Sequence, residues 1–125
     1  MKLLPAALVV AAVLAPAAYA DCTYPQAPGH IPDGTTATLK EMIAAMQVVK
    51  SYNEEMTAYL SCIQLERDSR VAAAGATLTK QQKQELEAIE NQKHNAAIDQ
   101  LQTVANQFNA QVKIFKARGK SSDSN

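Results

Sequence analysis

An apolar seam at alternating steps of three and four residues constrains this chain more than any other feature of its sequence. Its eight positions, seven of them apolar, are Leu39, Met42, Met46, Val49, Asn53, Met56, Leu60 and Ile63. That spacing is typical of an amphipathic helix of the coiled-coil kind, whose stripe is buried against another element. Asn53, the polar member, is expected to lie in the core and fix the register of the pairing. The seam predicts an all-α fold.

The first helix is expected to cover residues 38–74. Thr38 and Glu41 stand three residues apart, where a hydroxyl and a carboxylate satisfy each other's free backbone N–H groups in a capping box. At the other end, Gly75 follows three alanines and is a typical helix stop.

A second helix is expected over residues 80–118. Thr79 and Gln82 repeat the capping box, and no Pro or Gly interrupts the helix. Its apolar face comprises Leu86, Ile89, Ala97, Leu101, Val104, Phe108, Val112 and Phe115. Because the connection is short, the two helices should form a long antiparallel hairpin over residues 38–118. The polar tail, residues 119–125, has too little apolar surface to pack and is expected to be disordered.

The pairing is expected to be weakest near the connection, where Arg67 and Arg70 fall opposite Leu86 and Ile89. That end should fray or find a partner. Further apolar side chains lie off the seam: Ile43, Val48, Tyr52, Tyr59, Ile98 and Ile114. The tyrosines are expected to cover the edge of the core or an N-terminal arm, and the others are consistent with dimerisation into a four-helix arrangement.

Residues 1–20 have the pattern of a cleaved secretory signal peptide. Lys2 supplies the positive charge, residues 3–15 are apolar apart from one proline, and Ala18-Tyr19-Ala20 fits a cleavage site before Asp21. An uncleaved anchor is the alternative, but the run is shorter than the ~20 apolar residues that span a bilayer. We therefore expect a periplasmic or secreted protein without a stable membrane anchor.

Two cysteines in an exported chain predict one disulfide, between Cys22 and Cys62. Three prolines make residues 21–37 an extended arm, which reaches ~45 Å from Cys22 to Thr36 at ~3.3 Å per residue. Residue 62 lies ~39 Å along the helix from Thr36 at 1.5 Å per residue, so the arm can run back along the outer face of the first helix. Free thiols or an intermolecular bridge are the alternatives, and Asp21 disfavours an acylated Cys22.

Charge and motifs exclude several function classes. Without Lys2 the chain carries eleven basic and twelve acidic residues, a balance that attracts neither nucleic acid nor anionic membrane. The sequence contains no nucleophile elbow, no Cys-x-x-Cys and no glycine-rich phosphate loop. We therefore expect no enzyme activity and no cofactor.

A small-ligand or metal carrier is the alternative from another class. Glu87, Glu90 and His94 share one helix face, and carboxylates with an imidazole at this spacing can ligate a metal. A closed metal site requires three or four ligands, and the chain contains no second carboxylate–histidine motif that would complete the set. A solvated polar face is the favoured interpretation of these residues.

The first half of the mature chain carries a further pattern: Pro28, Ile31-Pro32-Asp33-Gly34, Ala37-Thr38, Glu41-Met42, Val49-Lys50, Tyr52, Met56, Tyr59-Leu60 and Cys62. It resembles that of small exported proteobacterial helical proteins of unknown function. The resemblance implies a bacterial periplasmic or secreted helical protein and transfers no functional residue. Together these features predict a non-enzymatic interaction or structural module that self-associates or binds a protein partner, with holdase-like activity as one form of it.

Overall fold

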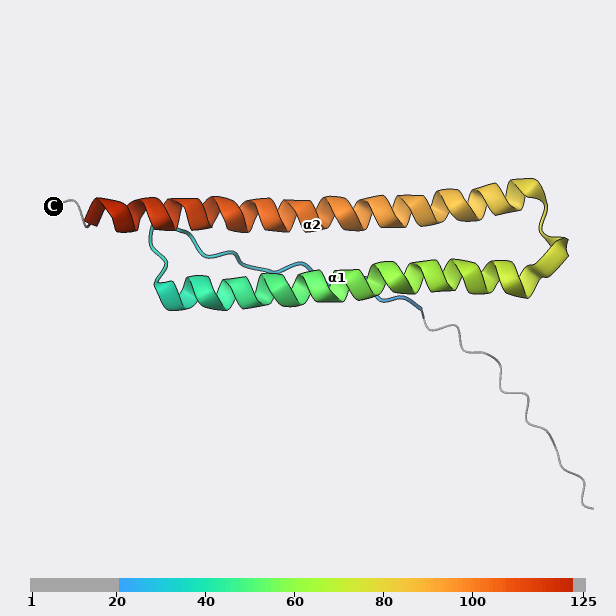
Figure 1. Cartoon of the computed structure of the whole chain (residues 1–125), viewed down its shortest axis with the longest axis horizontal. Coiled ribbons are helices and arrows are strands. Elements are labelled where there is room, and N and C mark those ends of the chain that lie inside the picture. The colour runs from blue at the N-terminus through green and yellow to red at the C-terminus, as the bar shows by residue number, and fades with distance from the viewer. Residues whose placement is uncertain (1–20, 123–125) are drawn as a thin grey trace, which may run out of the picture.

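Two long helices packed side by side, with an N-terminal arm against them, form the fold that the computed structural model gives for residues 21–122 (Figure 1). Helix α1 spans Leu39–Ala74, a short 3₁₀ turn spans Gly75–Thr77, and helix α2 spans Lys80–Ser122. The helices run antiparallel, and the described residues contain no strand. The prediction of an all-α helical hairpin is confirmed. The predicted signal peptide lies outside the described residues.

Both predicted capping boxes are present. The backbone N–H of Thr38 donates to Glu41 Oε2 at 2.7 Å, and the backbone N–H of Glu41 donates to Thr38 Oγ1 at 3.2 Å. In the second box, Thr79 donates to Gln82 Oε1 at 2.9 Å and receives the Gln82 N–H at 3.2 Å. These bonds satisfy N–H groups that a helix start leaves free, so each helix begins within a residue of its predicted start.

Helix α2 continues beyond its predicted end. The polar tail was expected to begin at Gly119, but α2 runs through Gly119 to Ser122. A single glycine costs a helix only about 1 kcal/mol, and no proline follows to stop the turn. Residues 123–125 lie outside the described residues.

The buried face of α1 differs from the predicted seam in one of its two rows. The buried side chains of α1 are Met42, Val49, Tyr52, Met56, Tyr59 and Ile63, and all of them except Met42 form one cluster with Ala97 and Val104 of α2. The first row, which consists of Met42, Val49, Met56 and Ile63, was predicted correctly. The second row is shifted by one residue, so that Tyr52 is buried in place of Asn53 and Tyr59 is buried beside Leu60, which is half-buried and still packs against the core.

The correction changes the role of Asn53. Its side chain is exposed, so it does not lie in the core and cannot fix the register of the helix pair as predicted. Leu39 and Met46 are also exposed, at 62% and 46%. The physical reason is that the two tyrosines bury far more apolar surface than an asparagine, and α1 is rotated to place them inside.

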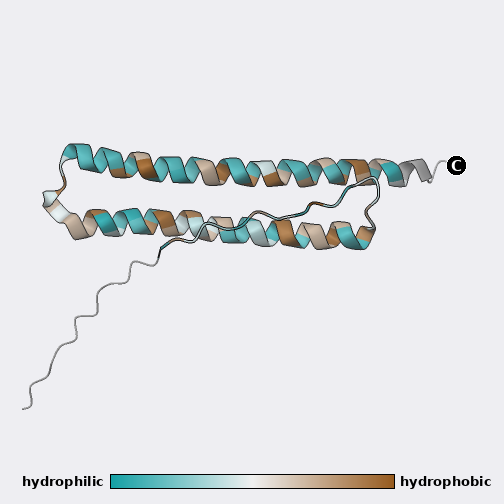
Figure 2. Cartoon of the chain, turned by 180° about the vertical axis from the view of Figure 1, so that it is seen from behind, coloured by the Kyte–Doolittle hydropathy of each residue, from teal (hydrophilic) through white to brown (hydrophobic). Residues whose placement is uncertain are grey.

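The N-terminal arm explains that rotation. It starts beside α1, runs antiparallel to it and crosses it obliquely, and ends beside α2 at the open end of the hairpin (Figures 1 and 2). The predicted disulfide, Cys22–Cys62, joins it to α1 with a Cα–Cα distance of 5.8 Å. Tyr24 of the arm meets Tyr59 edge to face with ring centroids 5.0 Å apart, and Ile31 packs against the core. The arm thus covers the flank of the helix pair on which the tyrosines lie.

Candidate functional site

The predicted metal ligands do not form a site. Glu90 makes an ion pair with Arg67 of α1, with Oε2 2.7 Å from a guanidinium nitrogen, while Glu87 and His94 are exposed. Nowhere in residues 21–122 do three His, Cys, Asp or Glu side chains gather in a way that could hold a metal ion. The structure therefore gives the carrier hypothesis no ligand set.

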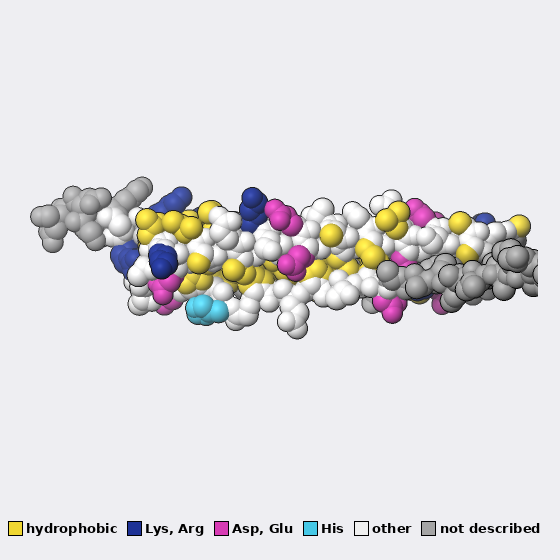
Figure 3. Space-filling view, turned by 90° about the horizontal axis from the view of Figure 1, so that it is seen from below, with side chains coloured by type: hydrophobic (Ala, Val, Ile, Leu, Met, Phe, Trp, Pro, Cys, Tyr) yellow, Lys and Arg dark blue, Asp and Glu magenta, His cyan; other side chains and the backbone are white. Residues whose placement is uncertain are grey.

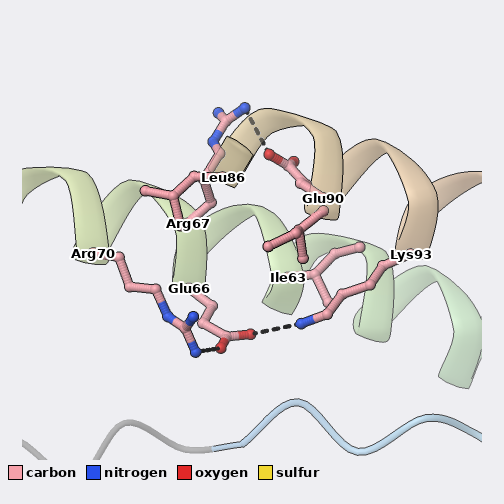
Figure 4. Close-up of a pocket in the computed structure, with 8 residues that line it drawn as sticks. Ile63, Glu66, Arg67, Arg70, Leu86, Glu90 and Lys93 are labelled. Carbon is pink, nitrogen blue, oxygen red and sulfur yellow. Dashed lines mark hydrogen bonds and ion pairs between the residues drawn. The ribbon is translucent and has the colours of Figure 1, made fainter. Parts of the chain in front are cut away.

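Charged residues replace the apolar core near the connection (Figure 4). Glu66 pairs with Arg70 on its own helix and lies 3.8 Å from Lys93 of α2, and the Arg67–Glu90 pair bridges the helices beside it. The side chains of Glu66 and Glu90 are only 12% and 16% exposed. The prediction of thin apolar packing at this end is confirmed, because the buried row of α1 ends at Ile63.

This cluster links the helices and offers little chemistry. The Arg67–Glu90 contact is short but lacks hydrogen-bond geometry, so the buried Oε2 of Glu90 accepts no hydrogen bond from the described residues. The hydrogen bonds that Arg67 donates to the Asp68 carboxylate raise the pKa of Arg67 and so keep its positive charge, with the Glu90 carboxylate as a smaller cause. Partly exposed ion pairs of this kind contribute about 0.2–1 kcal/mol each.

A run of exposed apolar side chains on one helix face lies at the opposite, open end of the hairpin. Leu39, Ile43 and Met46 are 62%, 48% and 46% exposed and follow one another at steps of four and three residues, on one face of α1. We call these three residues the α1 stripe. Hydrophobic side chains gather at this end of the molecule in the space-filling view (Figure 3). Leu65, 67% exposed, stands apart from the stripe.

The second notable surface is the side of α1 that carries Tyr52 and Tyr59, which we call the tyrosine flank. The N-terminal arm covers it. Tyr52 is 3% and Tyr59 8% exposed, and burial raises the pKa of both phenols. The hydroxyl of Tyr52 has no hydrogen-bond partner in the described structure. An unpaired buried hydroxyl costs about 1–3 kcal/mol, which the buried ring and the arm above it must offset.

Two contacts that fix the arm to α2 were not predicted from the sequence. Gly34 lies directly on the backbone of α2, and its N–H donates to Gln111 Oε1 at 2.9 Å. Arg118 donates to the carbonyls of Thr35 and Ala37 at 2.7 and 2.6 Å. The only signal in the sequence was the Asp-Gly turn, which predicts a bend and not its contact with the far helix.

Comparison with known proteins adds no relative: no family model, no curated protein and no solved structure matches this chain. Within the described part of the chain, neither helix combines the length and apolar character needed to cross a membrane. Any functional assignment therefore depends on the two surfaces described above.

Proposed function

We propose that this chain is an exported, non-enzymatic helical interaction module that self-associates through the α1 stripe. The observation that supports the proposal is the stripe itself: three large apolar side chains at helical spacing, each about half exposed or more. A run of apolar side chains on one helix face is the surface that helix-in-groove and helix–helix contacts use. A second copy presents the same stripe, so an isologous contact is available to it.

The compartment follows from the disulfide. A Cys22–Cys62 bridge suggests an oxidising environment, because cytosolic thiols are kept reduced. The predicted signal peptide and the resemblance to small exported proteins support a periplasmic or secreted location. An oxidising compartment and a protein-binding helical surface together favour a structural or interaction role over catalysis.

The exposed areas predict a weak contact. Burying an apolar side chain fully contributes about 1.5–3 kcal/mol, so a half-exposed one contributes about 1 kcal/mol, or about 6 kcal/mol for the six side chains of two stripes. Association itself costs at least about 4 kcal/mol. The surplus is about 2 kcal/mol, whereas a Kd of about 1 mM requires about 4 kcal/mol, so polar contacts at the rim of the stripe must contribute about 2 kcal/mol more. Dimers should therefore form only at high protein concentration.

Sedimentation velocity from about 10 μM to about 1 mM tests the proposal, a range set by the expected affinity. The wild-type chain should shift toward dimer as its concentration rises, and Ile43→Glu should remain monomeric because it places a charge in the stripe. Leu65→Glu is the matched control, since it places the same charge at a still more exposed aliphatic side chain on the same helix outside the stripe. A wild-type chain that is monomeric throughout, or equal effects of both substitutions, would refute self-association through this surface.

A further inference from the structure

Burial along the arm repeats every three residues. Cys22, Pro25, Pro28 and Ile31 are half-buried and Gly34 is buried, whereas most residues between them are exposed. A period of three is that of the polyproline II helix, which has three residues per turn and a rise of ~3.1 Å. The arm thus presents one face of a polyproline II segment to the helix pair.

The spacing of that face matches the spacing of the tyrosines. Pro25 and Tyr59 line one shallow hollow beside the disulfide, and Pro28 and Tyr52 line the next. Three polyproline II residues advance ~9.3 Å, and seven helical residues advance ~10.5 Å. Two prolines three residues apart therefore stand beside two tyrosines seven residues apart, one proline to each ring.

The match extends over the whole arm. From Cys22 to Gly34 a polyproline II segment covers ~37 Å, and from Cys62 back to Thr38 the helix covers ~36 Å. Between Asp21 and Pro32 the arm makes no backbone–backbone hydrogen bond to either helix. Apart from a 3.5 Å hydrogen bond that the Tyr24 hydroxyl donates to the carbonyl of Ala96, this part of the arm is held by side-chain packing, which is how aromatic-lined grooves bind proline-rich segments.

We propose that the tyrosine flank of the helix pair is a binding site for polyproline II segments of the form Pro-x-x-Pro-x-x-apolar, and that the arm is its internal occupant. The stated partner is an extended segment of another protein with proline at the two positions that meet Tyr59 and Tyr52. The site needs no charge from its ligand, because Pro25, Pro28 and Ile31 are uncharged. It is a different surface from the α1 stripe, so this proposal goes beyond self-association.

The disulfide controls access to this site. A dithiol reductant would attack one sulfur of Cys22–Cys62 through its thiolate, and the other cysteine would leave as a thiolate and take up a proton. The second thiol of the reductant would then resolve the mixed disulfide, leaving two cysteine thiols and an oxidised reductant. The arm would then keep only noncovalent contacts, among them the Tyr24–Tyr59 ring contact and the hydrogen bonds of Gly34 and Arg118, so a partner segment could compete for the tyrosines.

A capture experiment tests the site on the full mature chain carrying Cys22→Ser, which leaves the thiol of Cys62 free. A peptide with the sequence of residues 21–34 is equilibrated with it in a glutathione redox buffer, and intact mass gives the fraction of chain joined to peptide. The matched control peptide has the same thiol and charge but carries Pro25→Ala and Pro28→Ala. We expect at least about tenfold more capture of the proline peptide, since binding raises the local thiol concentration. Equal capture of both peptides would overturn the proposal.

A second measurement uses chains that keep both cysteines, so it does not depend on the stability of the Cys22→Ser variant. The oxidised chain carrying Pro25→Ala and Pro28→Ala has a weakened arm, and a fluorescent peptide of residues 21–34 with Cys22→Ser should bind it about tenfold more tightly than it binds the oxidised wild-type chain. Reduction of the wild-type chain should raise the affinity in the same direction. Equal anisotropy curves for all three would contradict the site. Ile43→Glu should leave peptide binding unchanged, which separates this test from that of self-association.

Discussion

Replacing Gly34 with alanine tests whether the arm is held by its close approach to α2. A Cβ atom on residue 34 would lie 2.2 Å from the carbonyl oxygen of Gln111, 2.9 Å from the backbone nitrogen of Phe115 and 3.0 Å from Cβ of Ile114. Two of these atoms belong to helical backbone and cannot move aside. Among described glycines only Gly75 has a positive φ, so space and not backbone conformation requires glycine at residue 34.

The expected loss of stability has three parts. Forcing the arm away from α2 should cost about 1–3 kcal/mol, as for other overpacked sites. The hydrogen bond from the Gly34 N–H to Gln111 would be lost, at a net cost of about 1 kcal/mol. Alanine restricts the unfolded chain and returns about 0.4–1 kcal/mol. The free energy of unfolding should therefore fall by about 2 kcal/mol.

Urea unfolding followed by far-UV circular dichroism, without reductant, measures this change. With an m value of about 1 kcal/mol/M for so small a chain, the midpoint should fall by about 2 M. Gly29→Ala is the matched control, because no heavy atom lies within 4 Å of a Cβ placed there. If Gly34→Ala lowers the midpoint no more than Gly29→Ala does, the contact with α2 is not what requires glycine.

Three other perturbations have definite expected outcomes. Met56→Ala, at a side chain with 0% exposure, should lower the free energy of unfolding by about 2–5 kcal/mol, whereas Met46→Ala should cost well under half as much; equal urea midpoints would contradict the burial pattern. Replacing both cysteines by serine opens a loop closed across 40 residues and should cost about 4 kcal/mol by thermal unfolding. Burial raises the pKa of Tyr52, so its stabilising contribution should be full below the ordinary tyrosine pKa of about 10 and fall as pH rises above it, as denaturant midpoints at pH 9 and about 11 would show.

The hairpin, its helix starts and its disulfide could be predicted because each depends on local or covalent chemistry. Capping boxes join residues three apart, and both were read directly from the chain. The disulfide pairs the only two cysteines, at lengths of arm and helix that agree. Predictions of this kind need no knowledge of how distant surfaces fit together.

The second row of the buried face could not be settled by periodicity. The rows through Tyr52 and through Asn53 both combine with Met42, Val49 and their heptad successors to give steps of three and four residues. The row through Asn53 also contains Met46 and Leu60, so it has more aliphatic residues than the row through Tyr52. What decides between the rows is the arm, a contact at long sequence separation that buries the flank of α1 with the tyrosines and leaves Leu39 and Met46 exposed on the other.

The shifted row and the exposed stripe have the same cause. Two helices in contact bury one face of each, with a half-exposed flank on either side of the contact. The arm covers one flank with Tyr24, Pro25 and Ile31, and nothing in the described structure covers the flank that carries Met46. An arm of residues 21–37 is long enough for one flank only, so an apolar residue on the other flank that α2 does not cover must remain exposed or meet another chain. If the arm were displaced by a partner segment, burial of the tyrosine flank would be preserved while the arm itself became exposed. The two surfaces can therefore be occupied independently, which is why substitutions in the α1 stripe and in the arm are expected to affect different binding measurements.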